Sequence, residues 1–183
     1  RVGPDLLGRD RATQREAMRR LFCEGSFAIS AHENKGHMKG GAAERRGLPY
    51  VLLISLGLAS DYGILVLQDR LRAWGIRAER SHIRDLGMVD AHIEGYRRVD
   101  SFDGNPPHVI TISITDDQVQ NANTLSGKLR SALPDAFILI GGPTSQTPEQ
   151  LACLVPDFDM LVKGDGDEIL PQIAWAIPRE AKG

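Results

Sequence analysis

The stretch HVITISITDDQVQNANTLSGKLRSALPDAFILIGG (108–142) holds two apolar runs separated by a helical pattern. HVITISI (108–114) and AFILIGG (136–142) are apolar and rich in β-branched residues, which is typical of strands buried on both faces. Between them, residues 116–133 begin with two acidic residues and repeat apolar ones at three- and four-residue steps, which predicts a helix. A strand–helix–strand unit of this length predicts two parallel strands.

The same alternation continues on both sides of this unit. We expect further strands and helices at 50–56, 60–75, 76–83, 88–99, 147–155, 159–164 and 167–177, in alternating order. Five such units predict an α/β fold: a doubly wound, flavodoxin- or Rossmann-like, five-stranded parallel sheet in the order 2-1-3-4-5. In that order, a ligand is expected above the carboxyl ends of the first and third strands.

The N-terminal part of the chain differs in composition from the rest. Residues 12–22 carry an apolar stripe at helical spacing, and 32–47 are rich in glycine and charge without apolar periodicity. We therefore expect an N-terminal amphipathic helix and a linker over 1–47, followed by an α/β domain over 48–183. Basic residues exceed acidic ones in the first part, and the balance reverses in the second.

Composition excludes several functional classes. The 183 residues are 42% hydrophobic and carry a net charge of −2, which argues against a nucleic-acid binder held by phosphate contacts. No apolar run reaches the about 18 residues of a membrane span, and no signal peptide opens the sequence. Cys23 and Cys153 make neither a disulfide framework nor a metal knuckle, so we expect a cytoplasmic protein with Cys153 buried on a helix stripe.

Two glycine-containing loops follow the last two strands. GGPTSQ (141–146) and KGDGDE (163–168) each precede a helix, and glycines there allow another backbone or a ligand to approach closely. The acidic residues of the second loop disfavour a bare polyphosphate, so the pair suits a large, mostly uncharged ligand that offers hydrogen-bonding groups. The alternative is that these glycines only form tight turns.

The sequences ILIGGPTSQTPEQL (138–151) and VPDFDMLVKGDGDEILPQIAWAI (155–177) resemble the cobalamin-binding domain of cobalamin-dependent radical S-adenosylmethionine enzymes. VLLISL (51–56) and HVITISIT (108–115) are similar to that family's first and third strands, and the resemblance spans 49–177. Three positions depart from the family pattern: Thr144 replaces a frequent histidine, and Asp165 and Asp167 stand where glutamate is common.

The resemblance implies cobalamin, with the corrin ring over the carboxyl edge of the sheet and the nucleotide tail between the first and third strands. The cofactor-binding residues that it implies are Leu58, Ser60, Asp61, Tyr62, Gly63, Ser113, Thr115, Gly141, Gly142, Pro143, Thr144, Gly164, Asp165, Gly166 and Glu168. It implies no catalytic residue in this chain. The loop LGLASDYGILV (56–66) lacks the histidine of the D-x-H-x-x-G motif, so we expect cobalamin to bind base-off with no protein imidazole on cobalt, and Tyr62 or Leu58 to shield the lower face.

Two cysteines cannot supply the three thiolates of a radical S-adenosylmethionine cluster. The resemblance implies that such a catalytic domain or protein is the partner, with methyl transfer as the reaction; the alternatives are a stand-alone corrinoid carrier and a degenerate domain. Three alternatives share the fold. A phospho-receiver would use Asp116 and Lys163 but needs an acidic pair after the first strand; a flavin mononucleotide domain needs a richer phosphate loop there; and a ligand-free interaction domain needs neither.

Overall fold

A computed structural model describes residues 49–57, 62–97, 107–144 and 146–177 of the chain. Five parallel strands form one sheet in the order β2-β1-β3-β4-β5, which confirms the predicted fold and strand order. The strands are β1 (Tyr50–Leu56), β2 (Arg77–Ile83), β3 (Val109–Ser113), β4 (Phe137–Gly141) and β5 (Met160–Val162). The predicted N-terminal helix, its linker and their boundary with the α/β domain lie outside the described residues.

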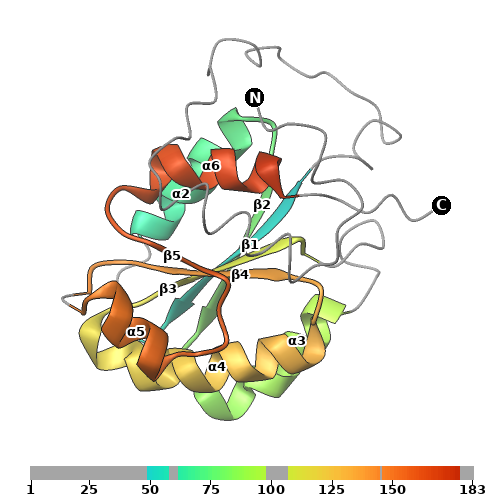
Figure 1. Cartoon of the computed structure of the whole chain (residues 1–183). Helices are drawn as coiled ribbons and strands as arrows, with labels where there is room; N and C mark the ends of the chain where they lie inside the picture. The colour runs from blue at the N-terminus through green and yellow to red at the C-terminus, as the bar shows by residue number, and fades with distance from the viewer. Residues whose placement is uncertain (1–48, 58–61, 98–106, 145, 178–183) are drawn as a thin grey trace. The chain divides into compact units, whose positions relative to one another are not determined.

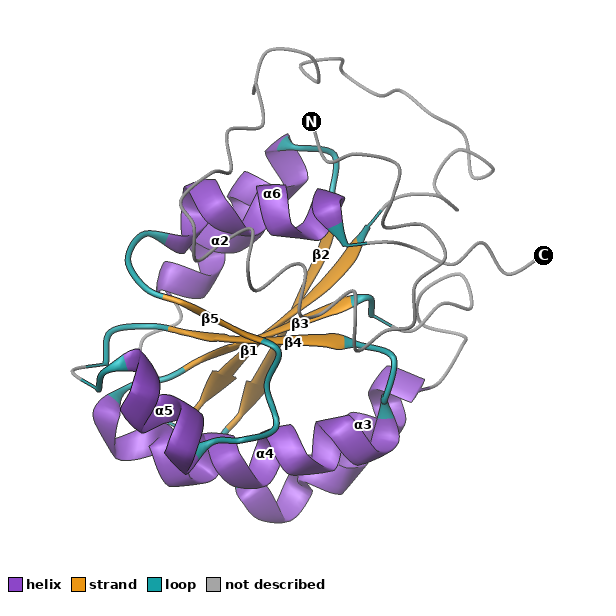
Figure 2. Cartoon of the chain, in the orientation of Figure 1, coloured by secondary structure: helices purple, strands orange, loops and turns teal. Residues whose placement is uncertain are grey.

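Helices cover both faces of the sheet (Figures 1 and 2). One face carries α2 and α6, and the other carries α3, α4 and α5. The helices are α2 (Tyr62–Ala73), α3 (Val89–Arg97), α4 (Val119–Ala132), α5 (Pro148–Leu154) and α6 (Gly166–Ala176), with short 3₁₀ turns at Leu86–Met88 and Asp116–Gln118. No helix in the described ranges combines the length and the apolar character that crossing a bilayer requires.

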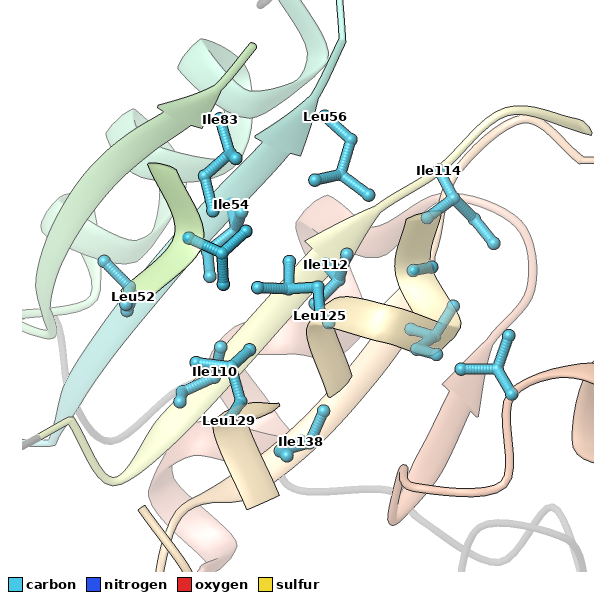
Figure 3. Packing of buried hydrophobic residues seen from close by; sticks show 14 of the residues in the cluster. Leu52, Ile54, Leu56, Ile83, Ile110, Ile112, Ile114, Leu125, Leu129 and Ile138 are labelled. Atoms are coloured by element: carbon cyan, nitrogen blue, oxygen red, sulfur yellow. The ribbon is translucent and has the colours of Figure 1, made fainter. Parts of the chain in front are cut away.

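Alternate residues of the central strands build the main core on the α3–α4–α5 face. Figure 3 shows how aliphatic side chains of β1, β3 and β4 meet those of α4. The strand residues in this cluster are Leu52, Ile54, Leu56, Ile110, Ile112, Ile138 and Ile140. Because side chains of a strand alternate between faces, Ser55, Thr111, Ser113 and Gly141 belong to the opposite face, under α2 and α6.

A buried ion pair fixes the amino end of the sheet between β4 and β5. Asp159 is 2% exposed. Its Oδ2 accepts hydrogen bonds from the backbone N–H of Ile138 (2.8 Å) and from Nη2 of Arg130 (2.7 Å). Nη1 of the same guanidinium donates to the carbonyl of Ala136 at 3.0 Å. The last connection before β5 is therefore anchored at the edge opposite to the loops that the sequence singles out.

Helix boundaries agree with the sequence patterns except in local details. Thr147 caps α5, because its Oγ1 accepts from the backbone N–H of Gln150 at 3.3 Å. Pro171 lies inside α6, not in its first turn. The expectation that Cys153 is buried is wrong: α5 has only 7 residues and buries Leu151 alone, so the thiol is exposed.

Candidate ligand site at the carboxyl edge of the sheet

Most of the predicted site residues gather at one edge, because parallel strands all end on the same side of a sheet. Ser113 ends β3 and is followed by Thr115, while Gly141 ends β4 and opens the loop through Thr144. The other described positions at this edge begin helices or precede them: Tyr62, Gly63, Gly164, Asp165, Gly166 and Glu168. Leu58, Ser60 and Asp61 lie outside the described residues, so their part in a site stays a prediction. Tyr62 is 73% exposed at the start of α2.

Three small residues lie side by side where the central strands end, and we call them the small-residue row. In the register of the sheet, Ser55 of β1 is opposite Ser113 of β3, and Ser113 is opposite Gly141 of β4. All three belong to the face covered by α2 and α6. Their side chains are smaller than the aliphatic ones that the same strands place on the other face.

A buried hydroxyl lies one layer deeper on the same face. Thr111 is two residues before Ser113 on β3 and is opposite Leu53 and Leu139. Its Oγ1 is buried and has no hydrogen-bond partner among the described residues. Thr111 is 7% exposed, and its neighbours Leu53 and Leu139 are 0% exposed, so the hydroxyl lies among aliphatic side chains.

The row continues into a polar contact on β2. His82 is opposite Ser55 in the register, and its Nδ1 lies 2.9 Å from the Ser55 hydroxyl. The other described histidines are elsewhere: His92 is on α3, and His108 precedes β3 at the amino edge. In the described ranges, no three His, Cys, Asp or Glu side chains come together in a way that could hold a metal ion.

The two glycines at the end of β4 make room for the protein's own backbone. A Cβ on Gly141 would lie 3.1 Å from the carbonyl oxygen of Val162 on β5. Gly142 has a φ of +120°, and a Cβ there would lie 2.8 Å from the backbone nitrogen of Ile114. The close approach of Ile114 therefore already requires a glycine at position 142, which the sequence had linked to a passing ligand.

On the α4 face, a side chain closes the gap between the ends of β1 and β3. Gln118 is 5% exposed. Its Nε2 donates to the carbonyl of Leu56 at 2.7 Å, and its Oε1 accepts from the backbone N–H of Thr115 at 3.0 Å. A ligand group that enters between these strands on the α4 face would have to displace this carboxamide. The small-residue row, on the α2–α6 face, has no such bridge among the described residues.

Hydrogen bonds tie two of the edge loops together. The hydroxyl of Thr144, after β4, donates to Oδ1 of Asp116, after β3, at 2.6 Å. Thr115 donates in the same way to Asp117, its neighbour in the 3₁₀ turn. These loops thus present carboxylate and hydroxyl oxygens at the edge. At the start of α5, bonds from its own backbone N–H and from Thr147 hold the pKa of Glu149 below its usual value.

The β5–α6 loop has structural reasons for its glycines and acids. Gly164 has a φ of +93°, which favours glycine, and a Cβ there would meet nothing within 4 Å. Asp167 and Glu168 lie in the first turn of α6, where the helix dipole favours negative charge. A Cβ on Gly166 would lie 3.4 Å from the Leu67 side chain, so α6 begins against α2 at this edge.

Three residues that shape the edge were not among the predicted site residues: Ser55, Thr111 and Gln118. A signal for Thr111 existed, since threonine and serine alternate with isoleucine along ITISIT (110–115) and must share one face. Gln118 follows Thr115 at the spacing of a capping box. Ser55 gave no signal, because its importance depends on which residue of β3 lies opposite.

Comparison with known proteins supports the fold. No family model matches the chain, and no curated protein matches its sequence. The cobalamin-dependent S-adenosylmethionine radical enzyme OxsB is 18% identical, with a TM-score of 0.57, over 72% of this chain and 19% of that chain. A cobalamin-binding protein from Desulfitobacterium hafniense DCB-2 is 15% identical, with a TM-score of 0.52, over 70% of this chain and 59% of that chain.

The orphan response regulator HP1043 of H. pylori is also similar: it is 13% identical over 72% of this chain and 97% of that chain, with a TM-score of 0.49. At these identities the likenesses to OxsB and to the cobalamin-binding protein establish a shared flavodoxin-like arrangement of strands and helices and no more. The chain spans less than two thirds of the first two proteins, so their activities describe longer molecules.

Proposed function

We propose that residues 49–177 bind a corrinoid of the cobalamin class in its base-off form, with the lower base detached from cobalt. The observation that carries the proposal is the small-residue row, with the buried and unpartnered Thr111 hydroxyl beneath it. We propose that a narrow group enters beside the small side chains of Ser55 and Ser113, and a polar atom on that group would satisfy the hydroxyl. The names of the two similar structures with TM-scores above 0.5 agree with this cofactor class.

The described residues fit the two parts of such a cofactor. The nucleotide tail would enter on the α2–α6 face, because Gln118 closes the α4 face between β1 and β3. The oxygens of Asp116 and Thr144 lie at the rim, where they would accept hydrogen bonds from the amide N–H groups that surround a corrin ring. A cofactor of this class supplies a methyl group for transfer to a substrate.

The cobalt would receive no histidine from the connecting loops. Residues 57–63, 115–117, 141–146 and 163–166 contain no histidine, and Nδ1 of His82 is engaged with Ser55. We therefore propose base-off binding without a protein imidazole, and presentation of the cofactor to a radical S-adenosylmethionine domain or partner protein. The rim residues Asp116 and Thr144 orient the ring, while the small-residue row holds the tail.

The test is binding of hydroxocobalamin to the full chain. We expect a red complex that stays together through gel filtration and has the absorption spectrum of base-off cobalamin. Ser113→Leu, or the smaller change Ser113→Val, fills the row and should abolish retention. Thr124→Leu enlarges an exposed residue of α4 on the opposite face and should leave retention intact. Loss of retention in both Ser113→Leu and Thr124→Leu, or in neither, would overturn the proposed slot.

A second measurement separates this proposal from a phospho-receiver of the same fold. A receiver binds Mg²⁺ and a phosphoryl analogue such as beryllofluoride through acidic residues at this edge. The corrinoid proposal predicts no change in the melting temperature on adding both. A clear upward shift that Asp116→Asn removes would favour the receiver and count against cobalamin.

A further inference from the structure

We propose that the Thr111 hydroxyl hydrogen-bonds to the edge of the lower base farthest from the ribose. The domain would then prefer corrinoids whose lower base carries a polar substituent at that edge. The lower base is the heterocycle at the end of the nucleotide tail. This inference rests on the proposed function and names the ligand that suits the same slot best. In cobalamin the far edge of the base carries two methyl groups, which cannot form a hydrogen bond with a hydroxyl.

The position of Thr111 sets the depth at which this contact is made. Strands rise about 3.3 Å per residue, so Thr111 lies ~7 Å below the small-residue row along β3. That depth is comparable to the long axis of a fused bicyclic base. A base whose sugar end lies at the level of Ser113 would bring its far edge beside Thr111.

The chemistry of the hydroxyl indicates what that edge should carry. A buried hydroxyl without a partner costs stability, and Oγ1 of Thr111 is buried without one. Its neighbours in the register are Leu53 and Leu139, which offer no side-chain hydrogen bond. Valine has nearly the same shape and would fill this place without an unmatched polar group. A ligand atom that pairs with the hydroxyl accounts for threonine here.

The lining of the slot supports a neutral polar group over an ion. The Thr111 side chain is uncharged, and the row above it consists of two serines and a glycine. Burying a charge here would lack a compensating partner among these residues. A phenolic hydroxyl, as in 5-hydroxybenzimidazole, fits this chemistry because it both donates and accepts one hydrogen bond.

The experiment compares two cobamides that differ only at the far edge of the base, one built on 5-hydroxybenzimidazole and one on 5-methylbenzimidazole. We expect the full chain to bind the hydroxyl form about fivefold more tightly, as one added hydrogen bond would give. Thr111→Val should abolish the preference, and Thr111→Ser should restore it. Melting of the ligand-free protein gives a second readout: Thr111→Val should melt no lower than the parent chain.

The outcomes separate this inference from the proposed function. Equal affinity for the two cobamides, or a preference that survives in Thr111→Val, overturns the role of Thr111 while cobalamin binding still stands. A lower melting temperature of ligand-free Thr111→Val would also overturn it, because the hydroxyl would then be paired within the protein. If cobalamin, both cobamides and the tail-less cobinamide all fail to bind, the proposed function itself is wrong.

Discussion

Replacing Gly142 by alanine should destabilise the domain by ~4 kcal/mol without any ligand present. Two costs contribute. The φ of +120° is a conformation that L side chains rarely adopt, at ~1–3 kcal/mol. The new Cβ would also lie 2.8 Å from the nitrogen of Ile114 and closer still to its carbonyl oxygen, and relieving such crowding costs a further ~1–3 kcal/mol. Because Ile114 N–H donates to the Gly141 carbonyl at 2.8 Å, the β3–β4 pairing would absorb the shift.

Urea unfolding of the full chain, followed by far-UV circular dichroism, measures this cost. With a slope of about 2 kcal/mol per molar urea, Gly142→Ala should lower the midpoint by ~2 M. Gly164→Ala is the matched control, because Gly164 has a φ of +93° but a Cβ there meets nothing within 4 Å. The control should lose about half as much, from backbone strain alone. Equal midpoints for the two variants would refute the claim that Ile114 crowds position 142.

Substitutions at three further positions test the contacts around the sheet. Arg130→Met removes the guanidinium that neutralises the buried carboxylate of Asp159 and should cost ~3 kcal/mol, seen as a melting temperature lower by about 10 °C. A loss under ~1 kcal/mol would contradict the role of this ion pair. Gln118→Leu removes the bridge between β1 and β3 and should cost ~2 kcal/mol in urea, whereas Gln118→Glu should recover stability on acidification as its carboxyl regains a proton to donate. Burial raises the pKa of Glu79 above its ordinary value, so the ionised carboxylate disfavours the folded state at neutral pH, and this cost disappears in acid as the carboxyl is protonated. Glu79→Gln should therefore raise the melting temperature near neutral pH, and the gain should vanish in acid.

The sequence patterns predicted the architecture well where strands are buried on both faces. The apolar run 50–56 gave the bounds of β1 without error, because both faces of that strand are covered by helices. The predicted ends of strands and helices were less accurate where turns and polar residues set them. The pattern over 159–164 predicted a longer strand than Met160–Val162, since the residues after it turn toward α6. The helix expected from 116 begins with a 3₁₀ turn through Gln118.

The sequence predicted which loops lie at the carboxyl edge of the sheet, but not which strand side chains lie beneath them. Glycines and helix starts mark the edge directly in the sequence. The pairing of Ser55 with Ser113 depends on the strand register, which no local pattern specifies. Gly142 shows the opposite difficulty: the sequence suggested a ligand, and the structure shows that the backbone of Ile114 needs the space. Reading such a glycine correctly requires knowing what lies within a few ångströms of it.

The bond between Thr144 and Asp116 makes two connecting segments depend on each other. A ligand that takes either oxygen for its own hydrogen bond breaks this link between the two segments. Amide protons on both segments should then change their exchange rates together, although each segment follows a different strand. Ligand binding at one of the two loops would in this way change amide exchange in the other loop, without a change in the sheet between them.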